Sequence, residues 1–211
     1  MNKLLIATNN NGKVIELQDL LKDTGIRLLT PADINLSLEV AEDGSTYAEN
    51  SSKKALAFSQ ASGLISLADD SGLEVNALDG APGLYSARYA PLRLPPFSEK
   101  MGGEKEGGDA DRRALLLENL KDKPRPWKAH FHATIAIAKP TGEVVLAEGN
   151  CFGEIIPTER GSGGFGYDPI FFIPELNKTM AELDMVEKNH VSHRALAVMK
   201  AMPVLKKMFG V

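Results

Sequence analysis

Two adjacent aspartates and a serine follow an apolar run in the stretch ADDSG, residues 68–72. Neighbouring side chains of an extended chain point to opposite sides, so one of Asp69 and Asp70 can hold a divalent cation while the other anchors the local structure. Carboxylate oxygens are hard ligands that suit Mg²⁺. Because Asp, Ser and Gly also favour turns, the stretch predicts either a simple turn between strands at 64–68 and 73–77 or a magnesium site.

A second polar stretch, TNNNGK at residues 8–13, follows the apolar run at 3–7 and precedes a predicted helix. This order brings backbone N–H groups, a hydroxyl and an ammonium group together, an arrangement that suits a phosphate group. It is not the GxxxxGK[ST] loop, because it has one glycine and Val14 follows Lys13. The alternative is an ordinary helix cap rich in asparagine.

The stretch GSGGFGYD, residues 161–168, combines four glycines with two rings and a carboxylate. Glycine lets the main chain approach a flat ligand closely, and Phe165 and Tyr167 offer ring faces. Asp168 can accept a hydrogen bond from a donor on the edge of a base. The stretch therefore indicates either a pocket for a base or a glycine-rich surface loop whose aromatic rings belong to the core.

Further charged groups lie at the ends of predicted elements. Glu42 and Asp43 precede a glycine turn and could add a carboxylate to the aspartate site. The stretch SHRA places His193 and Arg194 at the start of a predicted helix, where unpaired N–H groups also favour carbonyl oxygens or anions. Lys188 lies close by in the sequence.

Apolar spacing and capping patterns predict the helices. Apolar residues recur at helical spacing over 14–21, and TYAE at Thr46 has the capping-box form. Asp109 and Ser192 are candidate caps of two later helices, and Pro203 is expected to kink or end the second of these.

The predicted strands in the central part of the sequence form an antiparallel meander. Helices alternate with strands at both ends of the chain, which predicts an α/β protein with a mixed sheet. The predicted strands, besides those at 64–68 and 73–77, are at 3–7, 131–137, 143–150, 151–156 and 170–173.

The composition is that of one globular protein of 211 residues, 43% hydrophobic, with a net charge of −4. This charge gives no attraction to nucleic acid or an anionic membrane, so an anionic ligand must be held by local cations. The apolar stretch at 4–7 is too short for a signal peptide, and no run approaches a membrane span. The single cysteine, Cys151, is expected to be buried in a cytoplasmic protein. His130 and His132 share a strand face, where a polar outward face is favoured over a metal pair.

Four stretches together are similar to one family: TNNNGK, ADDSGLEVNALDGAPGLYSARYA, GSGGFGYDPIFF and EKN followed by SHRA. In this order they resemble the inosine triphosphate pyrophosphatases, also called Ham1-like or noncanonical purine nucleotide pyrophosphatases. The resemblance implies Mg²⁺-dependent hydrolysis of ITP, dITP and XTP to the monophosphate and pyrophosphate, which removes deaminated purines from the nucleotide pool. It also implies a homodimer, and an elongated mixed β-sheet flanked by helices, with residues 1–211 forming a single domain of two lobes around a central substrate cleft.

Roles follow from the resemblance residue by residue. Glu42 and Asp70 would bind Mg²⁺, and Asp70 would be the catalytic proton acceptor. A metal-bound carboxylate is a poor base, so Asp69 stays open as the group that takes the proton. The implied substrate-binding residues are Thr8, Asn9, Asn10, Asn11, Gly12, Lys13, Ser71, Phe165, Gly166, Tyr167, Asp168, Lys188, His193 and Arg194.

This sequence departs from the family pattern in three places. Residues 91–108 form a longer connection, which is expected to be a surface loop or flap; RRA stands at 112–114 where paired asparagines are frequent, and Trp127 takes a position usually given to Arg. Two other functions remain open: a pyrophosphatase for pyrimidine or methylated nucleotides, and a nucleotide-binding regulatory module without catalysis.

Overall fold

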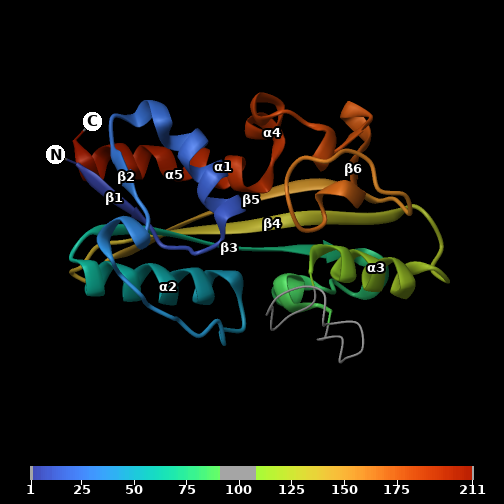
Figure 1. Ribbon diagram of the computed structural model, residues 1–211, viewed down its shortest axis with the longest axis horizontal. Coiled ribbons are helices and arrows are strands. Elements are labelled where there is room, and N and C mark those ends of the chain that lie inside the picture. Colours follow the sequence, from blue (N-terminus) through green and yellow to red (C-terminus); the bar gives the residue numbers. More distant parts are fainter. Residues whose placement is uncertain (1, 91–107, 211) are drawn as a thin grey trace. The chain divides into compact units, whose positions relative to one another are not determined.

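The computed structural model describes residues 2–90 and 108–210. The predicted loop at 91–108, apart from Gly108, lies outside these residues. The chain divides into two compact units, shown in Figure 1. The first unit comprises Met1–Ser71, His132–Cys151 and Met185–Val211, and the second comprises Gly72–Phe131 and Phe152–Asp184.

Among the described residues the strands form one seven-stranded sheet, with the order β2-β1-β3-β4-β5-β6-β7. Strand β1 is parallel to β2 and β3, whereas β6 is antiparallel to β5 and β7. The predicted mixed sheet of an α/β protein is confirmed. The strands are β1 (Lys3–Ile6), β2 (Arg27–Leu29), β3 (Ile65–Val75), β4 (Trp127–Ala138), β5 (Val144–Ile155), β6 (Phe171–Ile173) and β7 (Lys178–Thr179).

In the first unit, helices cover both faces of the strands (Figure 1). Leu4 and Ile6 pack with residues of α1 and α5, whereas Leu5 packs with residues of α2. On β3, Leu67 and Ala68 divide between the same two clusters. Both faces of these strands are apolar because helices bury both. The helices of the chain are α1 (Asn11–Leu21), α2 (Tyr47–Ser62), α3 (Asp109–Leu120), α4 (Met185–Val191) and α5 (His193–Phe209).

Side-chain caps set the start of three helices in this unit. The side chains of Asn10, Thr46 and Ser192 accept from backbone N–H groups at the starts of α1, α2 and α5. Each such cap contributes about 1 kcal/mol. The caps predicted at Thr46 and Ser192 are confirmed. Helix α5 continues past Pro203 to Phe209, so this proline does not end it.

Two predicted strand breaks are wrong. The turn predicted at 69–72 is absent, and these residues lie inside the continuous strand β3. The strands predicted at 143–150 and 151–156 form the single strand β5. The pairing of β3 with β1 ends at Leu67, but β3 is also hydrogen-bonded to β4, and this long-range pairing outweighs the local turn preference of Asp, Ser and Gly.

The second unit has its own core. The rings of Phe131 and Phe171 lie 4.5 Å apart, and the Tyr167 hydroxyl donates to the Ser86 carbonyl at 2.9 Å. Helix α3 packs against the 3₁₀ helices η3 (Asn76–Leu78) and η4 (Gly83–Arg88). The predicted cap Asp109 is instead the first helical residue, one position after the cap.

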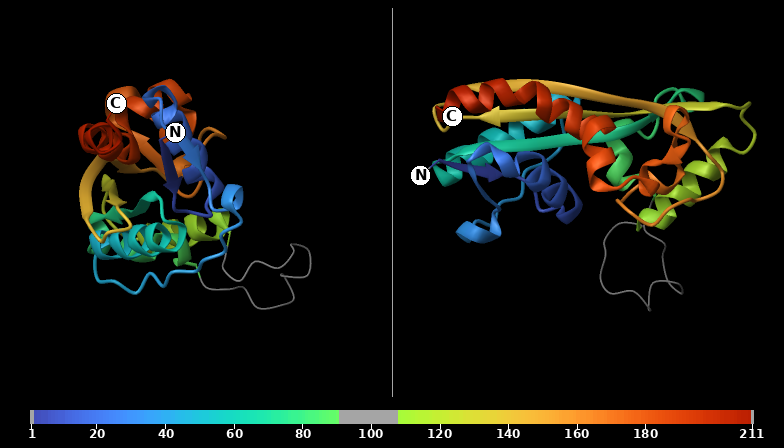
Figure 2. Two further views of the ribbon diagram at one scale, coloured as in Figure 1. Left: turned by 90° about the vertical axis from the view of Figure 1, so that its left-hand side faces the viewer. Right: turned by 90° about the horizontal axis from the view of Figure 1, so that it is seen from above.

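The two ends of the described chain meet in the first unit. The Asn2 side chain donates to the Phe209 carbonyl at 2.8 Å, and the views of Figure 2 agree with this closeness. Cys151 is buried, as predicted. A helix with the length and apolar character needed to cross a membrane does not occur within residues 2–90 and 108–210.

We expect Gly149→Ala to destabilise the first unit. Strand β5 approaches α5 so closely here that a Cβ atom would collide with the His193 carbonyl oxygen and lie 2.5 Å from the Ala197 nitrogen. Overpacking of this kind costs about 1–3 kcal/mol in free energy of unfolding, measurable by urea denaturation. The control is Gly108→Ala, where a Cβ meets no atom within 4 Å. Equal stability of the two variants would contradict this packing.

Candidate active site

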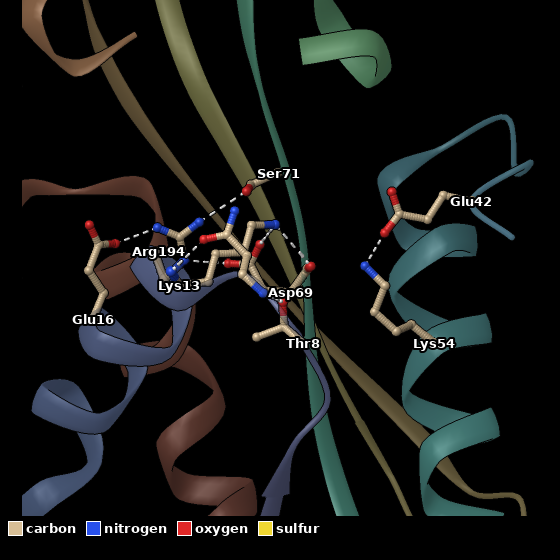
Figure 3. Close-up of polar contacts among 9 residues, drawn as sticks. Thr8, Lys13, Glu16, Glu42, Lys54, Asp69, Ser71 and Arg194 are labelled. Carbon is tan, nitrogen blue, oxygen red and sulfur yellow. Dashed lines mark hydrogen bonds and ion pairs between the residues drawn. The ribbon is translucent and has the colours of Figure 1, made fainter. Parts of the chain in front are cut away.

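The two aspartates of β3 point to opposite faces of the sheet because they are neighbours in an extended strand. Asp69 follows the alternation of Leu67 toward α1 and α5, and Asp70 follows that of Ala68 toward α2. Asp69 is fully buried and Asp70 is 8% exposed. The two carboxylates therefore occupy different surroundings, and Figure 3 shows Asp69 among its partners.

Asp69 is neutralised by two cations. Its Oδ2 accepts from Arg194 Nε at 2.6 Å, and its Oδ1 accepts from Lys13 Nζ at 2.7 Å. Burial alone would raise the pKa of Asp69, but Arg194 and then Lys13 outweigh burial and hold this pKa far below its ordinary value. Asp69 is therefore ionised at any physiological pH.

Glu16 extends these contacts into a buried charge network, defined as Lys13, Glu16, Asp69, Lys188 and Arg194. Glu16 accepts from Lys188 Nζ at 2.6 Å and also forms an ion pair with Arg194. Arg194 donates in addition to Ser71 Oγ at 3.0 Å. Three cations and two carboxylates leave one net positive charge, so the network favours an anion nearby.

Sequence reasoning did not select Glu16. It sits in the buried stripe of α1 beside Leu17, three residues after Lys13. A carboxylate on the apolar face of a helix is an available signal, because such a group is costly to bury without partners.

Asp70 has no such neutralisation. Its Oδ2 is buried and has no hydrogen-bond partner among the residues that the structure describes. Burial raises the pKa of Asp70 above its ordinary value, and the negative charge of Glu42 raises this pKa further. The charge of Lys13 and a hydrogen bond from Asn50 lower the pKa, but they do not cancel the rise. A carboxylate in these surroundings favours a proton or a cation.

A pocket of about 360 Å³ lies on the α2 side of the first unit. Glu42 and Lys54, which form an ion pair, both line it (Figure 3). The end of β1 lines it as well, so the predicted phosphate loop and the predicted metal ligand Glu42 face one hollow. The lining residues are Ala7, Thr8, Asn9, Leu38, Glu39, Val40, Glu42, Lys54 and Phe58.

The loop at 8–13 is held by its own side chains. Thr8 Oγ1 accepts from Asn10 N at 3.2 Å, and Asn10 Oδ1 accepts from Lys13 N at 3.1 Å. The three asparagines are exposed, whereas Thr8 is buried and Lys13 is largely covered. The loop thus combines the start of α1 with an ammonium group that reaches Asp69.

The glycine-rich loop of the second unit is tied to α3. Asp109 Oδ2 accepts from Gly166 N at 2.6 Å, and Asp168 Oδ2 accepts from Phe165 N at 3.1 Å. Tyr167 and Asp168 are buried, and Phe165 is partly exposed. Burial raises the pKa of the Tyr167 hydroxyl, which stays protonated. The role of residues 165–168 in nucleoside binding stays a prediction.

The histidines have separate surroundings. Burial lowers the pKa of His193 well below its ordinary value, so the imidazole is neutral. His132 Nδ1 lies 2.8 Å from Asn150 Oδ1, and its ring stacks on Tyr47 at 4.9 Å. His130 Nε2 lies 3.4 Å from Glu74. Over the described ranges, no three His, Cys, Asp or Glu residues form a group that could hold a metal ion.

Comparison with known proteins gives the family. The model of the Ham1 family matches residues 4–204. This chain belongs to the Ham1 family. The dITP/XTP pyrophosphatase of Desulforamulus reducens is 47% identical over 98% of this chain and 97% of the relative. That of Clostridium perfringens is 43% identical over 98% of both chains. The solved structure of a HAM1 protein from Coxiella burnetii has a TM-score of 0.82 and 37% identity, and it covers 98% of this chain and 100% of that protein.

We expect Arg194→Met to destabilise this Ham1 protein strongly. The substitution leaves Asp69 and Glu16 buried with one cation less each. Breaking a buried ion pair in this way costs about 3–5 kcal/mol, which urea unfolding at pH 7 measures. The control is Lys22→Met, which removes an exposed ion pair with Asp19 and should leave the unfolding midpoint nearly unchanged. Similar midpoints for the two variants would contradict a buried network.

We expect Asp70→Asn to stabilise the metal-free protein at neutral pH. The pKa of Asp70 is raised in the folded state, so stability falls as pH rises from the unfolded pKa, about 3.9, through the folded pKa. The free-energy cost of burying the ionised carboxylate is complete above the folded pKa, and the neutral amide of the variant removes this cost. In a chelator, thermal unfolding should show a higher midpoint for the variant at pH 7.5 and no difference below about pH 4. A lower midpoint at pH 7.5 would show that Asp70 is neutralised.

Proposed function

We propose that this protein hydrolyses the deaminated purine nucleotides dITP, ITP and XTP to the monophosphate and pyrophosphate. The names of relatives that are 43–47% identical over nearly the whole chain support this activity. The observation that carries the chemistry is the buried Asp70 carboxylate, of which one oxygen has no hydrogen-bond partner within residues 2–90 and 108–210, on the same strand as the neutralised Asp69.

We further propose that Glu42 and Asp70 hold Mg²⁺. The residues fit this ion: Asp70 Oδ2 is buried and has no hydrogen-bond partner in the part of the chain that the structure describes, and the charge of Glu42 acts on Asp70. Mg²⁺ commonly takes one or two carboxylates and completes its shell with water and phosphate oxygens, so a larger protein cluster is not required. When bound, the ion supplies charge neutralisation at phosphate oxygens.

Two lysines of the first unit are suited to the triphosphate. Lys54 lines the pocket and is paired with Glu42, and Lys13 belongs to a network with one net positive charge. Both ammonium groups can stabilise the negative charge that develops on departing pyrophosphate. Thr8, the three asparagines after it and Gly12 are proposed to bind phosphate through hydroxyl, amide and backbone N–H groups.

We assign the proton-accepting role to Asp70. Both oxygens of Asp69 accept from cations, and its pKa is held far below the ordinary range, so Asp69 is a poor proton acceptor. Asp70 Oδ2 has no hydrogen-bond partner among the described residues. Because a bound cation lowers the basicity of a carboxylate, we propose that Asp70 chiefly orients the water that attacks the α-phosphorus and accepts its proton as the P–O bond to pyrophosphate breaks.

Base selection is proposed to depend on the group at position 6 of the purine. A 6-oxo group accepts hydrogen bonds, so a donor there disfavours adenine, which presents an amino group. Arg194 is 1% exposed and is engaged by Asp69, Glu16 and Ser71, which gives it a structural role besides the predicted one. Contact of His193 and Lys188 with the nucleoside stays a prediction. The family resemblance further leads us to propose a homodimer in the cytoplasm.

The test is product analysis with Mg²⁺ and, in separate reactions, ITP, dITP, XTP, GTP, ATP and dTTP. We expect pyrophosphate from the deaminated purines and little from the others. Asp70→Asn should lower kcat by a factor of about 10² or more, as loss of a general base does, without loss of folding. Orthophosphate as the product, pyrophosphate chiefly from dTTP, or nucleotide binding without turnover would each overturn the proposal.

A further inference from the structure

We propose that Asn50 is a positioning residue that ties the segment carrying Glu42 to the strand carrying Asp70. The inference rests on the proposed function, in which these two carboxylates share a cation. Asn50 lies in the first turns of α2 and is 2% exposed. Its side chain is a polar carboxamide, so its burial requires hydrogen bonds to both the carbonyl oxygen and the NH₂ group.

One side of the carboxamide holds the Glu42 segment. Asn50 Oδ1 accepts from Gly44 N at 2.7 Å, two residues after Glu42. The contact is so close that a Cβ atom at residue 44 would lie 2.6 Å from Asn50 Oδ1 and 2.8 Å from Glu49 Cβ. Glycine is therefore required where this segment meets α2.

The other side of the carboxamide faces β3. With Oδ1 committed to Gly44, the amide NH₂ group is the part that can donate, and a hydrogen bond from the Asn50 side chain is one of the causes that lower the pKa of Asp70. Asn50 thus holds the backbone near one proposed ligand, and its amide group acts on the carboxylate of the other.

Neighbouring contacts from α2 support the same geometry. Glu49 Oε2 accepts from Ser45 N at 2.7 Å, and Lys54 forms an ion pair with Glu42. Glu42 and Asp70 repel each other as anions, and they are 28 positions apart in the chain (70 − 42). A neutral tie to a rigid helix lets the two carboxylates approach without adding a further charge.

The test compares Asn50→Ala with the wild type and with Ser59→Ala. Ser59 is buried on the same helix, and its hydroxyl contacts the Leu64 and Ala138 carbonyls, away from the proposed ligands. Both variants lose a buried hydrogen bond and should lose similar stability. We expect only Asn50→Ala to weaken Mn²⁺ binding to the nucleotide-free protein by about tenfold, measured by electron paramagnetic resonance, and to speed Gly44 amide exchange in a chelator by at least as much.

The variant Asn50→Asp tests the contact with Gly44 N separately from the hydrogen bond to Asp70. The carboxylate can still accept from Gly44 N, but it cannot donate to Asp70. We expect slow exchange of the Gly44 amide to return in this variant while kcat stays at least about tenfold below that of the wild type, since the donor to Asp70 is lost.

The outcomes distinguish the two proposals. Wild-type protein that releases no pyrophosphate from any nucleotide overturns the proposed function, whatever Asn50 does. Active wild-type protein, together with Asn50→Ala that matches Ser59→Ala in Mn²⁺ affinity and Gly44 exchange, overturns the positioning role. Full turnover of Asn50→Asp overturns the part of it that concerns Asp70.

Discussion

The alternation of side chains along β3 is the constraint on which the site depends. Because neighbouring residues of a strand face opposite ways, Asp69 and Asp70 enter environments built by different helices. Helices α1 and α5 supply the cations that neutralise Asp69, whereas Asp70 Oδ2, on the α2 side, has no hydrogen-bond partner in the described part of the chain. The alternation of side chains thus gives two chemically identical groups different surroundings and opposite pKa shifts.

Burying this much charge has a physical consequence for the rest of the first unit. Two buried carboxylates and three cations are desolvated together, and the cost is offset only when every ion keeps its partner. The apolar clusters on both faces of the strands, with Leu4 and Ile6 on one side and Leu5 on the other, supply the packing that holds α1, α2 and α5 in place. The charged groups are therefore held in place by these two apolar clusters, here called the apolar frame, and the apolar pattern of the sequence predicts much of it.

Much of that frame could be predicted from the sequence. The first strand, the first two helices and the cap at Ser192 follow from apolar period and capping chemistry, which act locally. The turn predicted at 69–72 was wrong because the pairing of β3 with β4, a strand distant in the sequence, is not a local property. This error concerns the residues to which we assign the chemistry, since an extended backbone is what separates Asp69 from Asp70.

Some residues of the site belong to sequence motifs, whereas others are recognised only from the residues they contact in the folded chain. Residues 8–13 and the aspartates carry motifs, so they could be selected from the sequence alone. Glu16 and Asn50 carry no motif and were not selected: the signal at Glu16 is only its place on the apolar face of α1, and an asparagine on a helix is ordinary until its partners are known. Arg194 was selected for contact with a base, and only the structure adds its ion pairs with residues 125 and 178 positions away.

The central claim, that Asp69 is a neutralised anchor and Asp70 the reactive carboxylate, is tested most directly by titration of the two carboxyl carbons. In metal-free protein with ¹³C-labelled aspartate, nuclear magnetic resonance follows each group separately. The account predicts that Asp69 remains ionised down to the pH of acid unfolding, whereas Asp70 titrates above the ordinary range of about 3.9. Titration of Asp69 above Asp70, or of both groups at the ordinary value, would contradict it.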